Sequence, residues 1–307
     1  MKQAPLLRVG QTFLLALSLS NGSAIFALGV ALAAERPQPP RRWVLTETRT
    51  LKGVGRAQGA AVHDGKLYVY GDADTGVIVE FTLDLQPTGR RLRLTRGGGD
   101  LISHPTGLTF HPRYGVFIGD SARGLLGRSA TIYQIDWERA WADGTLDHAV
   151  RAVIQDDLAK AGTRPEFVRV GDRWLLATAD YAPDGQVRLY DPGKLRDGGR
   201  TSELGVLVGW VGLNGRSQSL SWENRSGWLY CIQNPDAGRG WRVVIIDLER
   251  TFKESFNGPG LDLIQVIDFP FDNELEGLAL LPEDHFVLVT SEKQKNIHVG
   301  HFQAAAK

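Results

Sequence analysis

The strongest constraint on the fold is one pattern that recurs five times along the 307-residue chain. Each copy has a short alternating apolar segment, a tight turn, a second alternating segment, a polar loop and a third segment. Matching positions in the copies carry Gln58, Thr106, Glu166, Gln218 and Glu276, which are 48, 60, 52 and 58 residues apart. Repeats of roughly 50 residues built from period-2 segments are typical of β-propeller blades. The sequence therefore predicts an all-β fold of the β-propeller class.

The copy at 56–84 shows the pattern most completely. A run ending at Val62 meets the turn Asp64-Gly65, Lys66–Tyr70 alternates, and Val77–Thr82 follows a loop rich in Gly and Asp. Asp-Gly between two alternating segments is a strong hairpin signal, because both residues tolerate positive φ. We predict fourth strands for the first, third and fourth copies at 90–94, 203–208 and 263–268.

The two ends of the chain complement each other. The fifth copy, which begins at Glu274, lacks a fourth strand, and the alternating segment Trp43–Leu51 stands alone before the first copy. Pairing this N-terminal segment with the last sheet would close the ring and remove two exposed sheet edges. Five copies predict five blades. A sixth would require a degenerate blade within 137–162, where 137–144 reads as a helical turn or a surface excursion.

The N-terminus has the features of an export signal. A positively charged start precedes a mostly apolar stretch, and Ala31-Leu32-Ala33 resembles a small-residue cleavage site. We predict a signal peptide at 1–34, a proline-rich tether at 35–42 and a single propeller domain at 43–307, in a protein exported to the periplasm or beyond. The alternative is an uncleaved membrane anchor at 12–33, which approaches the ~20 residues that span a bilayer. Only that alternative would place the protein at a membrane.

The charge balance argues against nucleic acid as a partner. The chain has 35 basic and 35 acidic residues and no stripe of interleaved basic and aromatic residues. Nucleic-acid binding usually requires a positive face. We therefore expect a small molecule or a protein as the partner.

Candidate ligand-binding residues follow from the repeats. In a propeller, the first strand of each blade lines a central channel, and the loops that enter it share a face with the loops after the second strands. The polar residues of these loops are Arg56, Gln58, Asp72, His104, Asp120, Arg164, Glu166, Asp180, Arg216 and Gln218, together with Glu274 and Glu276. For the three aspartates the alternative is a structural role in Gly-rich turns. Trp210, which precedes the fourth copy, is a candidate border of the same pocket.

A cation is one possible ligand of this mouth. Glu166 and Glu276, with neighbouring amides, would offer the oxygen donors that suit calcium. The alternative is that the acids pair with the arginines that precede them and hold water in the channel. No Gly-x-Ser-x-Gly elbow is present and the histidines are scattered, so neither a serine nucleophile nor a zinc site is expected.

Two segments resemble known secreted propellers. Glu274-Leu-Glu-Gly-Leu-Ala-Leu-Leu-Pro-Glu-Asp with Phe286-Val-Leu-Val-Thr-Ser-Glu-Lys resembles a blade of the phytase-like esterases and SdiA-regulated proteins. His104-Pro-Thr-Gly-Leu-Thr-Phe-His-Pro is similar to first-strand segments of gluconolactonase-like and strictosidine-synthase-like propellers. In the gluconolactonase-like group an acidic residue before Gly at a first strand is a metal ligand, and the resemblance implies that role for Glu276.

These observations leave three classes of function. The first is an exported protein that binds a small ligand or a cation at the channel mouth. The second is a calcium-dependent hydrolase of lactones, phosphate esters or carboxyl esters. The third is a protein-interaction scaffold, because loops on a rigid ring suit partner recognition.

Overall fold

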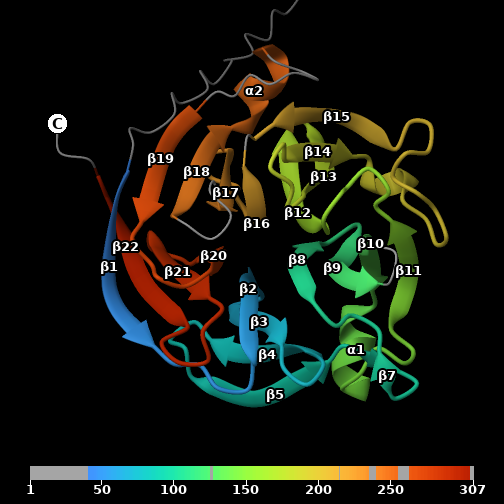
Figure 1. Ribbon diagram of the computed structural model, residues 1–307, viewed down its shortest axis with the longest axis horizontal. Coiled ribbons are helices and arrows are strands. Elements are labelled where there is room, and N and C mark those ends of the chain that lie inside the picture. Colours follow the sequence, from blue (N-terminus) through green and yellow to red (C-terminus); the bar gives the residue numbers. More distant parts are fainter. Residues whose placement is uncertain (1–40, 125–126, 214, 235–239, 255–262, 305–307) are drawn as a thin grey trace, which may run out of the picture. The chain divides into compact units, whose positions relative to one another are not determined.

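Five four-stranded antiparallel sheets form a ring in the computed structural model (Figure 1), which describes residues 41–124, 127–213, 215–234, 240–254 and 263–304. This confirms the predicted five-bladed β-propeller. The described part of 137–162 holds no sixth blade: it contains the helix α1 (Trp137–Asp143) and the strand β11 (Val150–Gln155), which completes the second blade.

In each blade the first strand lines the channel and the later strands follow outward. Blade 1 consists of β2 (Arg56–His63), β3 (Lys66–Asp72), β4 (Gly76–Thr82) and β5 (Pro87–Arg93), and blade 2 of β8 (Pro105–His111), β9 (Gly115–Gly124), β10 (Gly127–Ile135) and β11. Blade 3 consists of β12 (Arg164–Val170), β13 (Arg173–Ala179), β14 (Gln186–Tyr190) and β15 (Leu207–Gly212), and blade 4 of β16 (Arg216–Glu223), β17 (Trp228–Asn234), β18 (Trp241–Asp247) and β19 (Leu263–Phe269). Blade 5 consists of β20 (Leu275–Leu280), β21 (His285–Thr290), β22 (Ile297–Ala304) and β1 (Arg41–Arg49). The remaining elements are the small pair β6 (Thr95–Arg96) and β7 (Gly99–Asp100), the 3-10 turn η1 (Pro192–Lys194) and the helix α2 (Leu248–Glu254).

The ring closes as the sequence predicts. β1 pairs antiparallel with β22, so the outer strand of the last blade comes from the N-terminal end of the described chain (Figure 1). Trp43 lies among aromatic rings of blade 5, with centroids 4.6 Å from Phe286 and 4.8 Å from Phe302. In the described chain β1 starts at Arg41, two residues before the expected start at Trp43, and Arg41 pairs with Ala304 in the ladder. Both terminal guanidinium nitrogens of Arg41 donate to Glu223 of blade 4 at 2.9 Å.

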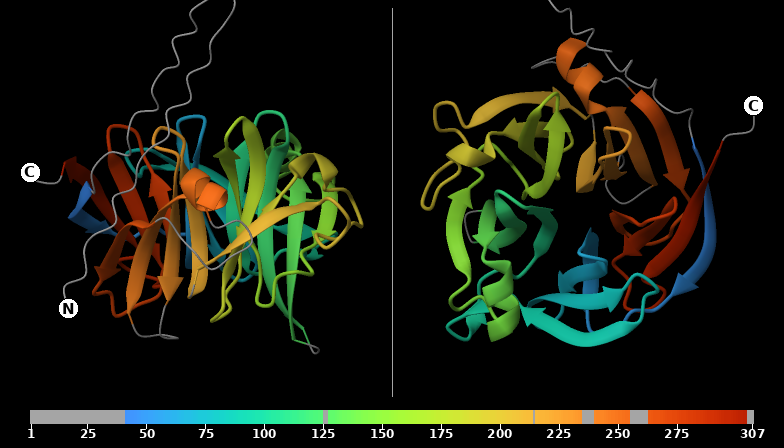
Figure 2. Two further views of the ribbon diagram at one scale, coloured as in Figure 1. Left: turned by 90° about the horizontal axis from the view of Figure 1, so that it is seen from above. Right: turned by 180° about the vertical axis from the view of Figure 1, so that it is seen from behind.

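The hydrophobic core is divided among the interfaces between neighbouring sheets. Val69 and Val289 belong to the cluster shared by blades 1 and 5, and Phe117 and Leu176 to the cluster shared by blades 2 and 3. Viewed from the side, the blades stand next to one another with their strands running between two faces (Figure 2). Each sheet therefore buries both faces except at its outer edge.

The inner strands approach one another so closely that side chains are excluded near the channel axis. A Cβ on Gly277 would lie 2.6 Å from the Cα of Gly59, and a Cβ on Gly107 would lie 3.0 Å from the nitrogen of Pro165. Real Cβ atoms essentially never lie within 3.0 Å of such atoms, and a Cβ on Gly107 would also lie 2.7 Å from Cδ of the rigid Pro165 ring, so glycine is required at these two positions. We call this level of the channel the neck, because the residues before it line one cavity and the residues after it line another.

Two outer segments differ from expectation. The fourth strand of blade 3 lies at Leu207–Gly212 instead of 203–208, because Glu203 begins a turn in which the Val206 amide donates to its carbonyl at 3.1 Å. The helix α2 follows β18 and was not anticipated. No helix within the described ranges is long and apolar enough to cross a membrane. The predicted signal peptide at 1–34 and the alternative anchor at 12–33 lie outside the described residues.

Replacement of Trp43 tests the closing strand. Trp43→Ala removes the ring that joins β1 to Phe286 and Phe302, and we expect it to lower the free energy of unfolding by about 3 kcal/mol. Leu45→Ala is the matched control on the same strand, because Leu45 is 41% exposed; its effect should stay within about 0.5 kcal/mol. Urea unfolding measures both. Equal losses for the two variants would contradict the closing role of Trp43.

Candidate functional site

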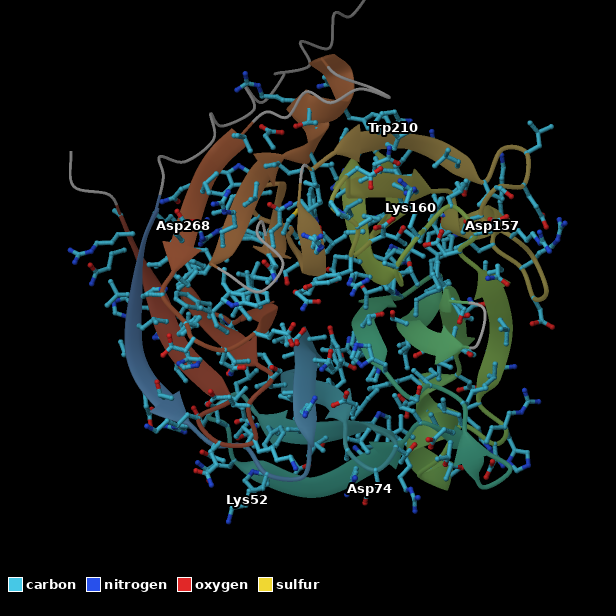
Figure 3. All side chains as sticks on the ribbon, in the orientation of Figure 1. Lys52, Asp74, Asp157, Lys160, Trp210 and Asp268 are labelled. Carbon is cyan, nitrogen blue, oxygen red and sulfur yellow. The ribbon has the colours of Figure 1, made fainter. Side chains whose placement is uncertain are left out.

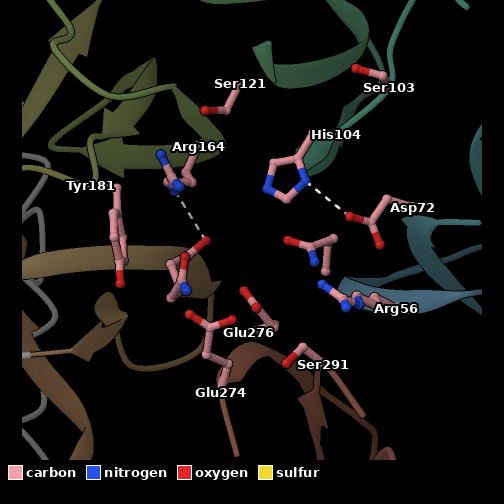
Figure 4. Close-up of a pocket in the computed structure, with 12 residues that line it drawn as sticks. Arg56, Asp72, Ser103, His104, Ser121, Arg164, Tyr181, Glu274, Glu276 and Ser291 are labelled. Carbon is pink, nitrogen blue, oxygen red and sulfur yellow. Dashed lines mark hydrogen bonds and ion pairs between the residues drawn. The ribbon is translucent and has the colours of Figure 1, made fainter. Parts of the chain in front are cut away.

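A cavity of ≈ 450 Å³ opens at the end of the channel where the inner strands begin. Side chains from all five blades line it (Figure 4). The lining residues are Arg56, Gln58, Asp72, Ser103, His104, Ser121, Arg164, Tyr181, Gln218, Glu274, Glu276 and Ser291. All of them are polar, so the cavity is suited to a polar ligand.

β-bulges position the deepest polar groups. The pairing of the first two strands shifts register at Gln58, Thr106, Gln218 and Glu276, in blades 1, 2, 4 and 5. A bulge inserts one unpaired residue and re-aims its side chain. Gln58, Gln218 and Glu276 are each at most 8% exposed and line the cavity. The Thr106 hydroxyl instead donates to the Thr163 carbonyl at 2.5 Å.

Blade 3 departs from this arrangement. β12 and β13 pair without a register shift, and Pro165, which packs on Gly107, stands at the neck. Arg164, just before the neck, therefore takes the place that the bulge residues occupy in the other blades. Glu166 lies beyond the neck, in a second cavity. The predicted equivalence of Glu166 with Gln58 and Glu276 is corrected by this register, and Glu166 does not share a cavity with Glu276.

His104 and Asp72 face each other across the junction of blades 1 and 2. Nδ1 of His104 lies 3.3 Å from Oδ2 of Asp72 (Figure 4). Behind them, Oδ1 of the buried Asp120 accepts the His104 backbone N–H at 3.2 Å. Burial raises the pKa of Asp120 to about 6, although the N–H donors of His104 and Ser121 partly oppose the rise. Asp120 thus supports the backbone at His104 and does not line the cavity.

The two arginines of the cavity are held differently. Arg164 is 2% exposed, donates to the carbonyls of Gln218 at 3.2 Å and Ala161 at 3.0 Å, and lies 5.6 Å from the ring centroid of Tyr181. Arg56 is exposed at the cavity rim, and its side chain makes no hydrogen bond or ion pair within the part of the chain that the structure describes. Arg164 is therefore a fixed guanidinium, whereas Arg56 is available to a ligand.

Glu276 and Glu274 form the acidic side of the cavity. In Figure 4 the side chain of Glu276 points into the cavity, and Glu274 lies beside it. Burial raises the pKa of Glu276 well above its ordinary value, the carboxylates of Glu274 and Asp72 raise it further, and Arg164 opposes them. The protonated, uncharged form of Glu276 is favoured as a result.

Other predicted residues lie outside the cavity wall. Arg216 is the half-buried first residue of β16, opposite Asn234 in the ladder. Asp180 is buried, 3.3 Å from a guanidinium nitrogen of Arg188, and accepts the backbone N–H of Lys160 at 3.1 Å. Trp210 lies on the outer strand β15, away from the axis (Figure 3). Seven of the predicted residues line the cavity, and their role in ligand binding stays a prediction. They are Arg56, Gln58, Asp72, His104, Arg164, Gln218 and Glu276.

Sequence reasoning missed Ser103, Ser121, Tyr181 and Ser291. Two of these had a readable signal. Ser121 and Ser291 each donate a backbone N–H to the residue that enters the first strand, His104 or Glu274, at 3.2 and 3.0 Å. Ser121 lies within β9 and Ser291 directly follows β21, each beside the residue that enters the first strand, as Asp72 lies opposite Arg56 in blade 1. An alignment of the strand ends, instead of the acidic residues alone, would have found them.

The carboxylates do not converge as a metal cage. Within the described residues, no three Asp, Glu, His or Cys side chains form a group that could hold a metal ion. Glu166 and Glu276, the predicted pair of ligands, line different cavities. Calcium binding stays a prediction that this donor set does not favour.

Comparisons with known proteins show the fold. No family model matches the chain, and no curated protein sequence matches it either. Among solved structures, glutaminyl cyclase from Myxococcus xanthus is 13% identical, with a TM-score of 0.55 over 88% of this chain and 100% of that one. The PQQ-bound aldose sugar dehydrogenase from Streptomyces coelicolor is 13% identical, with a TM-score of 0.49 over 87% of this chain and 100% of that one. The chain shares the propeller fold with the cyclase, and no specific family is assigned.

The environment of Asp120 predicts a pH effect. Its folded-state pKa of about 6 exceeds the ordinary 3.8, so the unfolded chain binds fewer protons between these values and the folded state loses stability as the pH rises from about 4 to about 6. Asp120→Asn removes this titration. Relative to the variant, the wild type should lose up to about 3 kcal/mol across the interval. Urea unfolding at several pH values measures the difference, and the exposed Asp172→Asn is the control. A constant difference between wild type and Asp120→Asn would contradict the raised pKa.

Proposed function

We propose that the protein binds a small, polar organic molecule bearing a carboxylate in the cavity at the channel mouth. The observation that carries this proposal is the division of charge within one polar cavity. Arg164 and His104 lie across the cavity from Glu274 and Glu276, and Arg56 lies at the rim on the side of blade 1, next to blade 5 (Figure 4). A molecule of ordinary metabolite size fits within ≈ 450 Å³.

Charge supports an anionic group on the ligand. The His104 and Asp72 side chains are paired, and the raised pKa of Glu276 favours its neutral form. Two guanidinium groups and His104 then share the cavity with the carboxyl groups of Glu274 and Asp72. The planar guanidinium of an arginine binds a carboxylate through two parallel hydrogen bonds. Arg56 is the first contact that we assign to the ligand, because it is exposed at the rim.

The other lining groups support additional polar substituents. The amides of Gln58 and Gln218 each offer donors and an acceptor, and Ser103, Ser121 and Ser291 offer hydroxyls. A protonated Glu276 can donate one further hydrogen bond. These groups suit a hydroxy acid, a sugar acid or an amino acid better than a bare metal ion.

A hydrolase is a second candidate, favoured by the acid pair. Glu274 is exposed and Glu276 is buried, and burial raises the pKa of Glu276 above its ordinary value, so the two neighbouring carboxyl groups stand in different environments. Such a pair is suited to general acid and base roles. Glu276 would donate a proton to the leaving group, and Glu274 would accept one from water.

Removal of the rim arginine tests the binding proposal. We expect gluconate and glutamine, each containing a carboxylate, to raise the melting temperature, and glucose at the same concentration to have no effect. Arg56→Gln should weaken carboxylate binding about tenfold or more, because a tenfold change needs only about 1.4 kcal/mol. Isothermal titration calorimetry measures the change. Arg169→Gln, which alters an exposed arginine of blade 3 that pairs with Asp172, is the matched control. Binding of glucose equal to that of gluconate, or no response to either carboxylate, would contradict the proposal.

Turnover distinguishes the second candidate. We expect a hydrolase to cleave gluconolactone, p-nitrophenyl acetate or p-nitrophenyl phosphate, and Glu276→Gln to lower the rate at least about a hundredfold because the amide cannot donate the catalytic proton. Assays with calcium and with a chelator show whether the predicted metal takes part. Hydrolysis that survives Glu276→Gln would exclude Glu276 as the acid, and the absence of hydrolysis with retained gluconate binding would leave binding as the function.

A further inference from the structure

The channel has a second cavity, of ≈ 150 Å³, on the far side of the glycine neck. All five inner strands contribute to it, with the segments that follow the neck. Its lining residues are Ala60, Ala61, Val62, Leu108, Thr109, Phe110, Glu166, Ser221, Trp222, Leu278, Ala279 and Leu280. The side chains that line the mouth cavity are all polar, whereas most side chains that line this one are apolar, although polar atoms form the larger part of its accessible wall. Glu166 is its one ionisable lining residue. The two cavities therefore suit different ligands.

The fold does not require an acid at the position of Glu166. The residue next after the neck is Ala60 in blade 1, Leu108 in blade 2, Leu220 in blade 4 and Leu278 in blade 5. Four blades thus place an apolar side chain where blade 3 places a carboxyl. Enclosing a carboxyl among apolar groups costs free energy, so its presence indicates a specific role.

Glu166 is held in place with acceptor capacity to spare. Its Oε1 accepts the backbone N–H of Trp222 at 3.3 Å, and the Thr109 hydroxyl also donates to its side chain. The Ser221 hydroxyl is directed away, to the Leu278 carbonyl at 2.5 Å. A carboxylate has about four acceptor sites, so these two donors leave room for a ligand. Enclosure by protein raises the pKa of Glu166 to about 8, which a positive ligand beside it would reverse.

We propose that this second cavity binds a small organic ammonium ion, with the ammonium group on Glu166 and a short apolar tail against Leu108 and Leu278. Charge complementarity selects the ammonium group, because the one charge available in the cavity is negative. The size limits the tail, because a cavity of about 150 Å³ accommodates a molecule the size of benzene, which is comparable to a four-carbon amine, and Leu108 and Leu278 offer that tail apolar contacts. The site is separate from the mouth cavity, so it does not rest on the function proposed there.

Titration calorimetry with n-butylammonium chloride tests the site. The measurement is made near pH 9, roughly midway between the carboxyl and amine titrations, with n-butanol and sodium butyrate as compounds of similar shape and different charge. We expect the wild type to bind butylammonium at least about tenfold more tightly than butanol, and to show no binding of butyrate.

Three variants locate the bound ion. Glu166→Leu restores the apolar residue of other blades, and Glu166→Gln keeps the shape and the hydrogen-bonding size of the side chain; each should weaken butylammonium binding at least about tenfold. Glu276→Gln changes the acid of the mouth cavity and should leave butylammonium binding unchanged. If Glu166→Leu does not fold, Glu166→Gln and the comparison of the three compounds on the wild type decide the matter. Three results for butylammonium would overturn the proposal: unchanged binding in Glu166→Gln, loss of binding in Glu276→Gln, or binding to the wild type no tighter than that of butanol. A wild type that binds none of the three compounds would overturn it as well.

Discussion

Closure of the ring by β1 is the interaction on which the candidate site depends. Glu274, Glu276 and Ser291 belong to the last blade, and Arg56, Gln58 and Asp72 belong to the first. These two sets face one cavity only because β1 completes blade 5 and blade 5 packs on blade 1. The contact of Gly277 with Gly59 fixes that junction at the axis. The stability of the N-terminal strand and the geometry of the mouth are therefore linked.

The sequence carried most of the architecture because alternation and Asp-Gly turns are local signals. Five blades, the inner strands and the closing strand all follow from them. Register did not follow, because a bulge adds one residue without disturbing the alternation on either side. The spacing of the repeats treats Glu166 as the partner of Gln58, whereas the unbulged pairing of β12 with β13 gives that place to Arg164. The sequence therefore predicted that polar residues line the candidate site, but it did not predict correctly which residue of blade 3 does so.

Two glutamates of the channel, the buried Glu276 and the partly exposed Glu166, are shifted by the same physical cause in different surroundings. Burial raises the pKa of both Glu166 and Glu276. Glu276 has charged neighbours, Glu274 and Arg164, so its proton responds to the charge of a ligand in a polar cavity. Glu166 is held by neutral donors, Thr109 and the Trp222 amide, among apolar side chains. The neck keeps the two carboxyls in separate environments, and each is suited to a different ligand charge.

Differences between the blades give the mouth its polarity. A ring of identical blades would present one residue type around the axis and could not orient an asymmetric ligand. Here the equivalent positions carry amides in blades 1 and 4, a guanidinium in blade 3 and a carboxyl in blade 5. Because rigid inner strands hold each group, the direction from Arg164 to Glu276 is fixed before a ligand arrives. A molecule with an anionic end and a hydrogen-bonding end then has one favoured orientation. In such a preorganised site the loop residues recognise the charge of the ligand, while the packing between the blades stabilises the ring.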